Sequence, residues 1–251
     1  MARQPDTRDQ RMRTPTLWLY GVHPVRAALT NPRRRCYRLF YSGESMRGVV
    51  SLAEERNNPP KISRVAPDTF ESLLGSDVSH QNVALEVAPL TQPSWQQACR
   101  TSHLLVMLDQ LQDPHNVGAI IRSCWLFGVE GVFMTRRHSP KESAAMAKTA
   151  SGGIDNVPLY TIINVNQTLR TLKKNGFFCL GLSADGKTPL SQWQRKPQDK
   201  CVLVLGQEGR GLRHLTAKQC DTLLAIPHAV GASLNVSVAC GIALYALTHD
   251  A

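Results

Sequence analysis

The segment from residue 109 to residue 122 combines an amide, a glycine and a guanidinium at the start of a predicted helix. Asn116 and Arg122 are six residues apart, close to two helical turns, so both can face the end of the preceding apolar run. Gly118 near the helix start makes the helix less stable by ~1 kcal/mol than Ala would. A glycine at this position therefore indicates that another part of the backbone or a ligand comes close to the helix there. Taken alone, Asn116 is typical of a helix cap and Arg122 of a surface charge.

A glycine-rich loop follows the apolar run CVLVL and reads GQEGRGL from Gly206 to Leu212. Its three glycines let the backbone turn sharply and approach a ligand, and Glu208 adds a carboxylate between them. The glycine order GxxGxG differs from the dinucleotide fingerprint GxGxxG, and the segment lies late in the chain. The loop therefore disfavours an NAD-dependent enzyme.

A third polar cluster opens the last predicted helix. Ser233, Asn235 and Ser237 lie within five residues of one another, where free backbone N–H groups of a helix start also point outward. Simple capping would use one of these side chains, so the cluster indicates a binding or positioning role for the others.

Other catalytic signatures are incomplete. Residues 181–188 fit the phosphate-loop pattern GxxxxGK[ST], but Pro189 follows directly and disfavours the helix that a phosphate loop must enter. A nucleotide hydrolase that uses Lys187 stays a distant alternative. The eight histidines form no HxxxH pair and no GxSxG elbow follows a strand, so we expect neither a metal site nor a hydrolase triad.

The elements that would hold these loops alternate between apolar runs and helical segments from Leu104 onward, which predicts a doubly wound α/β fold with a parallel sheet. Ligands of such sheets bind beyond the carboxyl ends of the strands, where all three polar loops fall. The predicted strands are Leu104–Leu108, Val132–Met134, Leu159–Ile162, Phe177–Leu182, Val202–Leu205 and Leu223–Ile226. The predicted helices begin near Val117, Lys141, Val165, Leu212 and Ser233.

A smaller α/β domain precedes this sheet. It combines short strands near residues 19, 37–42, 62–65 and 83–87 with helices near residues 24–29, 49–56 and 69–74. Pro89 and Pro93 in a polar stretch mark a linker. We expect a disordered basic arm over 1–15, the small domain over 16–88, the linker over 89–101 and the large domain over 102–251.

Positive charge is concentrated near the start of the chain. The net charge is +10, and the first 50 residues hold ten Arg against three acidic residues. This excess favours a polyanionic partner, because guanidinium groups of Arg33, Arg34 and Arg35 could bind phosphates at a helix end. A solvated run of charge is the simpler interpretation of the triplet.

Composition excludes several classes of protein. Apolar residues make up 42% of the chain and charged residues 19%, which is typical of a globular protein and not of a disordered one. No apolar run reaches the ~18 residues that a membrane span needs. The seven cysteines are scattered, which favours reduced thiols, and Met1–Pro15 is too polar for a secretory signal. We expect a cytoplasmic protein with no membrane partner; Asp6 and Asp9 make an organellar transit peptide the less favoured alternative.

Together the three loops resemble the SpoU (TrmH-type) branch of the SPOUT superfamily, which are RNA ribose 2'-O-methyltransferases. The runs LDQLQDPHNVGAIIRSCWLFGV (108–129), LVLGQEGRGL (203–212) and IPHAVGASLNVSVACGIALY (226–245) are similar to the three family motifs in the same order. KTASGGIDNVPL (148–159) resembles a further family segment. LYGVHPVRAAL and HQNVALEV are similar to the small substrate-binding domain found in front of many members.

The resemblance implies a fold, a cofactor and a partner. The fold would be a SPOUT-type sheet with a C-terminal trefoil knot, and the enzyme would be a homodimer whose active site is completed across its two subunits. S-adenosylmethionine would be bound by the residues Leu205, Gly206, Gln207, Gly209, Ile226 and Leu234. The substrate would be a structured rRNA or tRNA, for which His23 and the three arginines Arg33, Arg34 and Arg35 are candidate contacts.

The resemblance also assigns a catalytic set. Arg122 is the candidate for activating the 2'-hydroxyl, but an arginine with a pKa above ~12 is a poor base at neutral pH. We therefore expect Arg122 to clamp the adjacent phosphate and the 2'-oxygen. The residues expected to position it and the ribose are Asn116, Glu208, Ser233 and Asn235.

The sequence departs from the family pattern at three places. Asn82 stands where Gly is common, Gln207 replaces a smaller residue or Asn, and the loop from Pro227 to Ser233 is one residue short. These departures bear on RNA specificity and on cofactor contacts. A non-catalytic RNA-binding protein with the same fold is the main alternative function.

Overall fold

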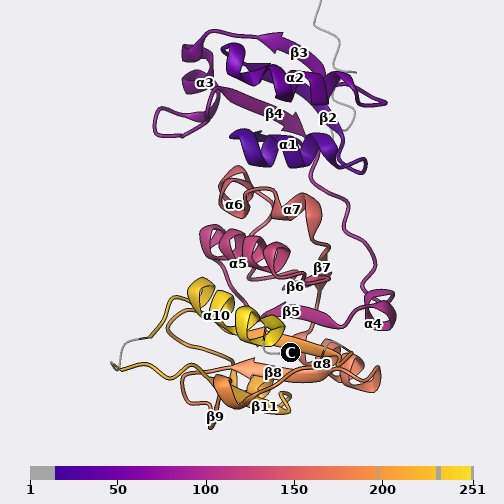
Figure 1. Ribbon diagram of the computed structural model, residues 1–251, viewed down its shortest axis with the longest axis vertical. Coiled ribbons are helices and arrows are strands. Elements are labelled where there is room, and N and C mark those ends of the chain that lie inside the picture. Colours follow the sequence, from indigo (N-terminus) through magenta and orange to yellow (C-terminus); the bar gives the residue numbers. More distant parts are fainter. Residues whose placement is uncertain (1–14, 197, 230–232, 250–251) are drawn as a thin grey trace, which may run out of the picture.

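The computed structural model describes residues 15–196, 198–229 and 233–249, which form two sheets that follow one another along the chain (Figure 1). The expected arm falls almost entirely outside the described residues. The first sheet lies at one end of the elongated molecule, and the last helix lies toward the other end.

The N-terminal sheet has four strands in the order β1-β4-β2-β3. Its central pairs are antiparallel and β3 runs parallel to β2. Leu19, Leu39 and Leu85 are in register on one face and are fully buried, so they lie at the centre of the core of this sheet. The elements are β1 (Leu17–Tyr20), α1 (Val22–Thr30), β2 (Cys36–Tyr41), η1 (Glu44–Met46), α2 (Arg47–Glu54), β3 (Lys61–Arg64), α3 (Pro67–Leu74) and β4 (Val83–Val87).

The second sheet has seven strands in the order β7-β6-β5-β10-β8-β11-β9, and all of its paired strands are parallel. This confirms the doubly wound α/β class predicted from the apolar runs. The strands are β5 (Leu104–Leu108), β6 (Val132–Thr135), β7 (Leu159–Ile162), β8 (Phe178–Leu182), β9 (Thr188–Pro189), β10 (Cys201–Leu205) and β11 (Thr222–Ala225). The helical elements are α4 (Ala98–Thr101), α5 (Pro114–Leu126), α6 (Ala144–Ala150), α7 (Gly153–Asn156), α8 (Val165–Lys174), η2 (Leu190–Gln192), α9 (His214–Ala217) and α10 (Val236–His249).

The phosphate-loop pattern at residues 181–188 does not enter a helix. Its last residue, Thr188, begins the short strand β9, which pairs with β11, and only the single turn η2 follows. This agrees with the prediction from the sequence that Pro189, directly after Thr188, disfavours a helix at this point. The segment therefore lacks the helix start that would bind a nucleotide phosphate.

Asn116 does not cap α5, as its position had suggested. Asp113 is the N-cap, and its carboxylate accepts hydrogen bonds from the backbone N–H groups of His115 and Asn116. Pro114 occupies the first helical turn, where its missing N–H costs nothing. The side chain of Asn116 is thereby free to bind elsewhere.

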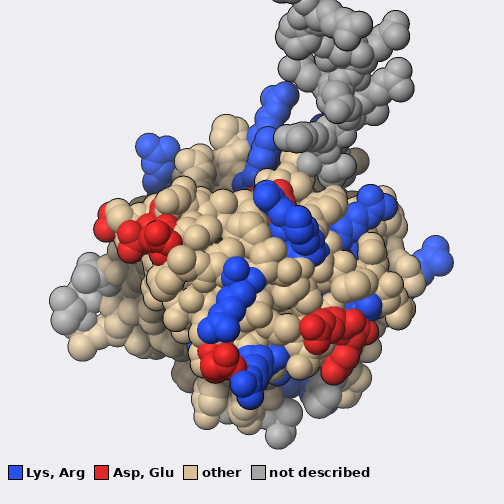
Figure 2. Space-filling view, turned by 90° about the horizontal axis from the view of Figure 1, so that it is seen from above, with Lys and Arg blue, Asp and Glu red and all other residues tan. Residues whose placement is uncertain are grey.

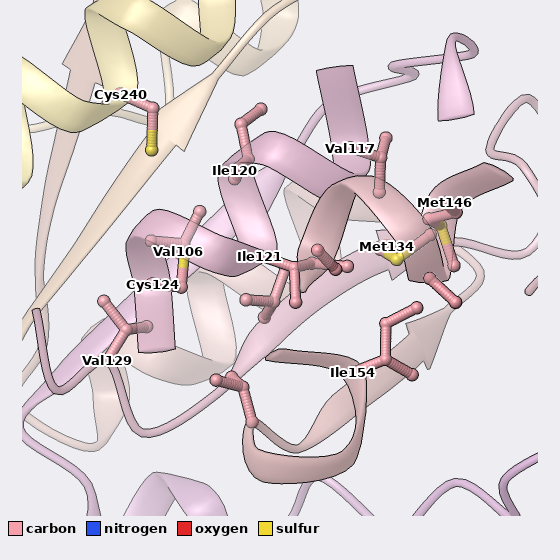
Figure 3. Close-up of a cluster of buried hydrophobic side chains, with 14 of the residues drawn as sticks. Val106, Val117, Ile120, Ile121, Cys124, Val129, Met134, Met146, Ile154 and Cys240 are labelled. Carbon is pink, nitrogen blue, oxygen red and sulfur yellow. The ribbon is translucent and has the colours of Figure 1, made fainter. Parts of the chain in front are cut away.

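Gly118 permits a close contact between two helices. A Cβ atom at this position would lie 2.6 Å from the carbonyl oxygen of Met146 in α6. The neighbouring residues Val117, Ile121 and Cys124 of α5 form part of the core that Figure 3 shows between the helices and the sheet. Helix packing, and not the approach of a ligand, accounts for the glycine.

Burial raises the pKa of several cysteine thiols. All seven cysteines are free, and six of them are buried. Desolvation is the main cause that raises the pKa of Cys179 and of Cys220 to about 12, so both thiols stay protonated and unreactive near neutral pH.

No helix in the described part of the chain is both long and apolar enough to cross a membrane. The segment that joins β11 to α10 includes residues 230–232, which lie outside the described residues, and the trefoil knot stays a prediction.

A buried arginine joins the N-terminal sheet to the second sheet. Arg34, 1% exposed, follows α1, and its guanidinium donates to both carboxylate oxygens of Asp155 in α7 at 2.8 and 2.9 Å. It also donates to Glu142 at 2.6 Å and to the carbonyl oxygen of Ala88 at 3.1 Å. Burial by itself lowers the pKa of Arg34, but the two carboxylates outweigh it and raise the pKa above its usual value.

Arg34→Met is expected to destabilise the protein by about 3–5 kcal/mol, because it leaves the carboxylates of Asp155 and Glu142 buried without their cation. Arg35→Met, at the next and exposed position, is the matched control and should change stability little. Urea unfolding measures both values. Equal stability of the two variants would show that the buried ion pairs do not hold the two parts together.

Candidate active site and its relatives

The three polar loops meet at one edge of the seven-stranded sheet. The loops after β5 and β10 are adjacent because these strands pair in register. The backbone N–H of Asp109 donates to the carbonyl oxygen of Leu205 at 2.8 Å, and Gln207 Nε2 donates to the carbonyl oxygen of Gln110 at 3.1 Å. Asp109 also pairs with Arg213 at 2.6 Å. The sheet thus places the carboxyl ends of its strands where ligands bind in this class of fold.

Side chains from all three loops form one hydrogen-bonded cluster. Asn116 Nδ2 donates to Glu208 Oε2 at 2.8 Å, and Asn235 Nδ2 donates to Glu208 Oε1 at 3.2 Å. Asn235 Nδ2 also donates to Asn116 Oδ1 at 3.0 Å. Ser237 secures the cluster from α10, since its N–H and its hydroxyl donate to Asn235 Oδ1 at 2.8 and 2.6 Å. We call Asn116, Glu208 and Asn235 the amide–carboxylate cluster.

The amide–carboxylate cluster has a defined chemical capacity. Each oxygen of Glu208 accepts one amide N–H, which leaves further lone pairs of the carboxylate for a hydroxyl donor. Both donors come from neutral amides, so no cation within the cluster competes for the carboxylate. The arrangement can orient an incoming hydroxyl group whose proton points at Glu208.

A pocket next to the cluster contains all six residues expected to bind the cofactor. Its walls include Leu205, Gly206, Gln207, Gly209, Ile226 and Leu234, together with Ser233 and Glu208. Aliphatic side chains provide a surface for an apolar ring system, and the glycine loop exposes backbone groups for polar ones. The residues present therefore fit S-adenosylmethionine, although no contact with it is observed and this assignment stays a prediction.

The glycine loop is closed on itself. Gln207 and Gly211 exchange two backbone hydrogen bonds of 3.0 and 2.8 Å, with Gly209 and Gly211 at φ values of 76° and 64°. A Cβ atom on Gly206 would lie 2.1 Å from the carbonyl carbon of Gly211. Gly206 is thus required for the turn that brings Glu208 to the other two loops.

A second, more polar pocket adjoins the first and shares Gln207, Glu208 and Val236 with it. Asn116, Gln110 and Arg210 also line this second pocket. The sequence interpretation did not single out Gln110 or Arg210. The place of Arg210 inside the glycine loop was a usable signal, whereas nothing in the sequence indicates the left-handed backbone of Gln110, at φ 63°.

Two predicted catalytic residues lie outside the amide–carboxylate cluster. Ser233 is exposed and lines the cofactor pocket. Arg122 is exposed on α5, and six residues of helix separate it from Asn116, a rise of ~9 Å. Within the described part of one chain, its guanidinium has no hydrogen-bond or ion-pair partner.

The candidate RNA contacts have different positions. His23, Arg33 and Arg35 are exposed, and Arg33 lines a cleft between the two sheets. Arg34 is not available to RNA, because its guanidinium is buried and paired with Asp155 and Glu142. The expectation that all three arginines of the triplet bind phosphate was therefore wrong for Arg34.

The end of the molecule that carries the N-terminal sheet is not uniformly basic. Figure 2 views the molecule from this end and shows Lys and Arg side chains set singly among Asp and Glu. The Lys and Arg side chains of the described residues therefore do not gather into one patch on this face. A polyanion that binds here has to be recognised by individual cations.

The departure from the family pattern at Asn82 has a physical explanation. Gln81 and Asn82 both have left-handed backbones, at φ values of 54° and 59°. Asn tolerates this conformation better than other residues with a side chain. The turn directs Gln81 Oε1 to accept from Val22 N at 3.1 Å and from Lys148 Nζ at 2.9 Å, which links the N-terminal sheet to α6. Burial lowers the pKa of Lys148.

Two family descriptions match the chain. Residues 103–245 match the SpoU rRNA Methylase family, and residues 18–93 match the description "RNA 2'-O ribose methyltransferase substrate binding". These two matches cover the second sheet with its three loops and the N-terminal sheet.

Curated relatives agree with the family match. The chain is 34% identical over 240 residues to a 23S rRNA (guanosine-2'-O-)-methyltransferase RlmB of Yersinia pestis, covering 92% of this chain and 96% of the relative. It is also 34% identical to an uncharacterized tRNA/rRNA methyltransferase of Synechocystis, but it spans only 61% of that protein's length.

Solved structures share the fold. A TrmH-family protein of Porphyromonas gingivalis matches with a TM-score of 0.73 and 22% identity, covering 94% of this chain and 90% of that one. The SpoU methyltransferase AviRb of Streptomyces viridochromogenes, in complex with AdoMet, matches with a TM-score of 0.76 and 21% identity, covering 96% and 92% of the two chains.

The chain belongs to the SpoU family of S-adenosylmethionine-dependent RNA 2'-O-methyltransferases. The resemblance of its three motifs to this family is thus confirmed, and so are the expected class of reaction and the cofactor. The roles of individual residues are addressed below.

Gly206→Ala is expected to weaken S-adenosylmethionine binding at least ~10-fold, because a side chain at this position forces the glycine loop open. Gly48→Ala, in α2, is the control, since Gly48 has no positive φ and the added Cβ would have only Arg26 Nη1 within 4 Å, at 3.6 Å. Calorimetric titration measures both affinities, and circular dichroism verifies folding. Leu234→Ala, on an exposed wall of the same pocket, should also weaken binding if Gly206→Ala does not fold. Unchanged affinity in a folded Gly206→Ala or in Leu234→Ala would place the cofactor elsewhere.

Proposed function

We propose that this chain methylates the ribose 2'-OH of a guanosine in large-subunit ribosomal RNA and that it acts as a homodimer. The RlmB relatives, whose length the chain covers almost completely, support this choice of substrate over a tRNA. The observation that carries the proposal is the amide–carboxylate cluster, whose Glu208 lines both the cofactor pocket and the polar pocket and whose Asn116 lines the polar pocket. A hydroxyl group bound in the polar pocket would therefore lie beside the methyl donor.

The reaction requires the 2'-hydroxyl to lose its proton as its oxygen attacks a methyl group. S-adenosylmethionine, when bound, would supply that methyl group from its sulfonium sulfur and would leave as S-adenosylhomocysteine, and the hydroxyl proton would pass to the Glu208 carboxylate and from it to solvent. Glu208 accepts the hydrogen bond of the 2'-OH with its free lone pairs, and Asn116 and Asn235 hold the carboxylate in place. This fixes the direction of the hydroxyl oxygen before transfer.

Cations complete the polar side of the site. Arg210 lines the polar pocket beside Glu208, where it can bind a phosphate next to the target ribose. Arg122 supplies a second guanidinium that stabilises the charge developing on the 2'-oxygen. Because Arg122 lies almost two helical turns from Asn116 along α5, we propose that Arg122 contributes to the active site of the partner subunit and not to the site of its own subunit.

An exposed apolar surface supports the dimer. Leu126 of α5 is 67% exposed, and Val238 and Tyr245 of α10 are 51% and 58% exposed. The two helices pack against each other, and Tyr245 of α10 contacts Phe127, the residue after Leu126. Arg122 lies four residues before Leu126 and therefore on the same side of α5. A second subunit that covers this face would bring Arg122 close to the partner.

Arg122→Ala is expected to reduce methyl transfer under single-turnover conditions ~100-fold or more, because one guanidinium that stabilises the transition state is removed. S-adenosylmethionine affinity should not change, since Arg122 does not line the cofactor pocket. Arg170→Ala, an exposed arginine on α8, is the control and should keep full activity. Full transfer by Arg122→Ala would remove Arg122 from the mechanism. If the wild-type protein also binds RNA but does not methylate it, the chain is a non-catalytic RNA-binding protein.

Mixing inactive subunits tests whether the site is shared. Heterodimers of Arg122→Ala and Glu208→Gln chains should contain one intact site, so a denatured and refolded mixture should recover about a quarter of the normal activity. Each variant treated alone should stay inactive. Absence of recovery in a mixture that is shown to contain heterodimers would mean that Arg122 and Glu208 act within the same subunit.

A further inference from the structure

A cleft of about 500 Å³ lies between the N-terminal sheet and the second sheet, outside the site described above. Its walls come from the residues that enter β1, from the loop after α1, from the linker between β4 and α4, from the carboxyl end of β6 and from the start of the edge strand β7. The linker runs along this side of the molecule (Figure 1). The cleft has the size of a pocket that holds a nucleotide-sized group, within the usual range of ~300–1,000 Å³.

Three unpaired cations line this cleft. Arg33 comes from the N-terminal part, and Arg136 and Lys141 come from the loop between β6 and α6. All three are exposed, and in the described part of the chain their charged groups have no hydrogen-bond or ion-pair partner. Such a group of free cations attracts phosphate or carboxylate groups.

The acidic residue on the wall does not cancel this charge. Glu142 is the only acid among the described residues that line the cleft. Its Oε1 binds the buried Arg34 at 2.6 Å, and its Oε2 accepts the backbone N–H of Leu90 at 2.9 Å. Because both oxygens are engaged, Glu142 serves the junction between the two parts and leaves the three cations to a ligand.

The walls of the cleft are held in place. The Thr135 hydroxyl donates to the carbonyl oxygen of Arg137 at 2.6 Å and lies 2.9 Å from the Ser139 hydroxyl. The backbone N–H of Arg136 donates to Ile162 at 2.7 Å. Prolines restrict the backbone of the remaining wall, at positions Pro89, Pro93, Pro140 and Pro158. The cations are therefore presented by an ordered frame.

We propose that this cleft binds phosphates of the RNA backbone and forms a second RNA contact beside the methyl-transfer site. The proposal rests on the proposed function. RNA suits the cleft because the three cations come from both the N-terminal part and the second sheet, so one RNA strand can contact both parts of the chain at once. The cleft also includes the carboxyl end of β6, which pairs in parallel with β5, the strand that leads into the methyl-transfer site. By charge, RNA suits the three cations better than residues 1–14 of this chain, which hold four Arg against two Asp.

The test compares two double variants that each remove two positive charges. Arg136→Ala/Lys141→Ala alters the cleft, and Lys174→Ala/Lys218→Ala removes exposed lysines from the opposite edge of the sheet. The affinity of each double variant for an unmodified large-subunit rRNA transcript is measured over a range of salt concentrations. The cleft variant should lower the slope of log K against log salt by about 1.4–1.8, the value for two lost phosphate contacts, and should weaken binding ~10-fold. The control variant should keep the slope of the unmodified protein.

Kinetics separate a binding role from a catalytic one. The cleft variant should raise the KM for RNA ~10-fold and keep the single-turnover rate at saturating RNA, because the amide–carboxylate cluster is intact. Equal salt slopes for the two double variants, with both folded, would overturn the proposal. A second result would also overturn it. If the cleft variant no longer binds 5'-GMP but keeps the salt slope of RNA binding of the wild-type protein, the ligand of the cleft is a free nucleotide and not the RNA backbone. Failure of the proposed function appears separately, as absent methyl transfer by the unmodified protein.

Discussion

The carboxylate of Glu208 is the group on which the site depends. It accepts hydrogen bonds from Asn116 and Asn235, which lie 92 residues before it and 27 residues after it. The pairing of β5 with β10 brings the first two loops together, and Glu208 joins the loop before α10 to them at the same edge of the sheet. The glycines around Glu208 make this possible, because a side chain at Gly206 would collide with the returning loop. The same carboxylate lines the polar pocket and keeps lone pairs that no described residue uses, so we propose that the group that assembles the site also orients the substrate.

The buried guanidinium of Arg34 connects the two parts of the molecule. Arg34 joins the N-terminal part to α7 through Asp155 and to the loop between β6 and α6 through Glu142. Removing either carboxylate would leave a buried guanidinium without full compensation, so the junction favours one relative placement of the two parts. That placement shapes the cleft lined by Arg33, Arg136 and Lys141. Adjacent arginines of one triplet thus have opposite roles, one inside the protein and one toward a ligand.

Much of the fold was predictable because the buried parallel strands are continuous apolar runs. Val202–Leu205 and Leu104–Leu108 lie within β10 and β5, and the loops that follow them contain the polar residues singled out from sequence. The two-residue strand β9 was not predicted, because Thr188–Pro189 carries no apolar pattern. The role of Asn116 was only partly predictable: the polarity of the position was visible, but Asp113 and Pro114 start the helix three residues earlier. Arg34 could not be distinguished from its neighbours, because its partner Asp155 is 121 residues away.

The central claim is that the amide–carboxylate cluster directs methyl transfer to a ribose oxygen. The most direct measurement is transfer of a labelled methyl group from S-adenosylmethionine to unmodified large-subunit rRNA, followed by ribonuclease digestion. A 2'-O-methyl group blocks cleavage at its own linkage, so the account predicts that the label is recovered in a single nuclease-resistant dinucleotide that contains guanosine. Label on a base, or no label despite bound cofactor and bound RNA, would contradict it.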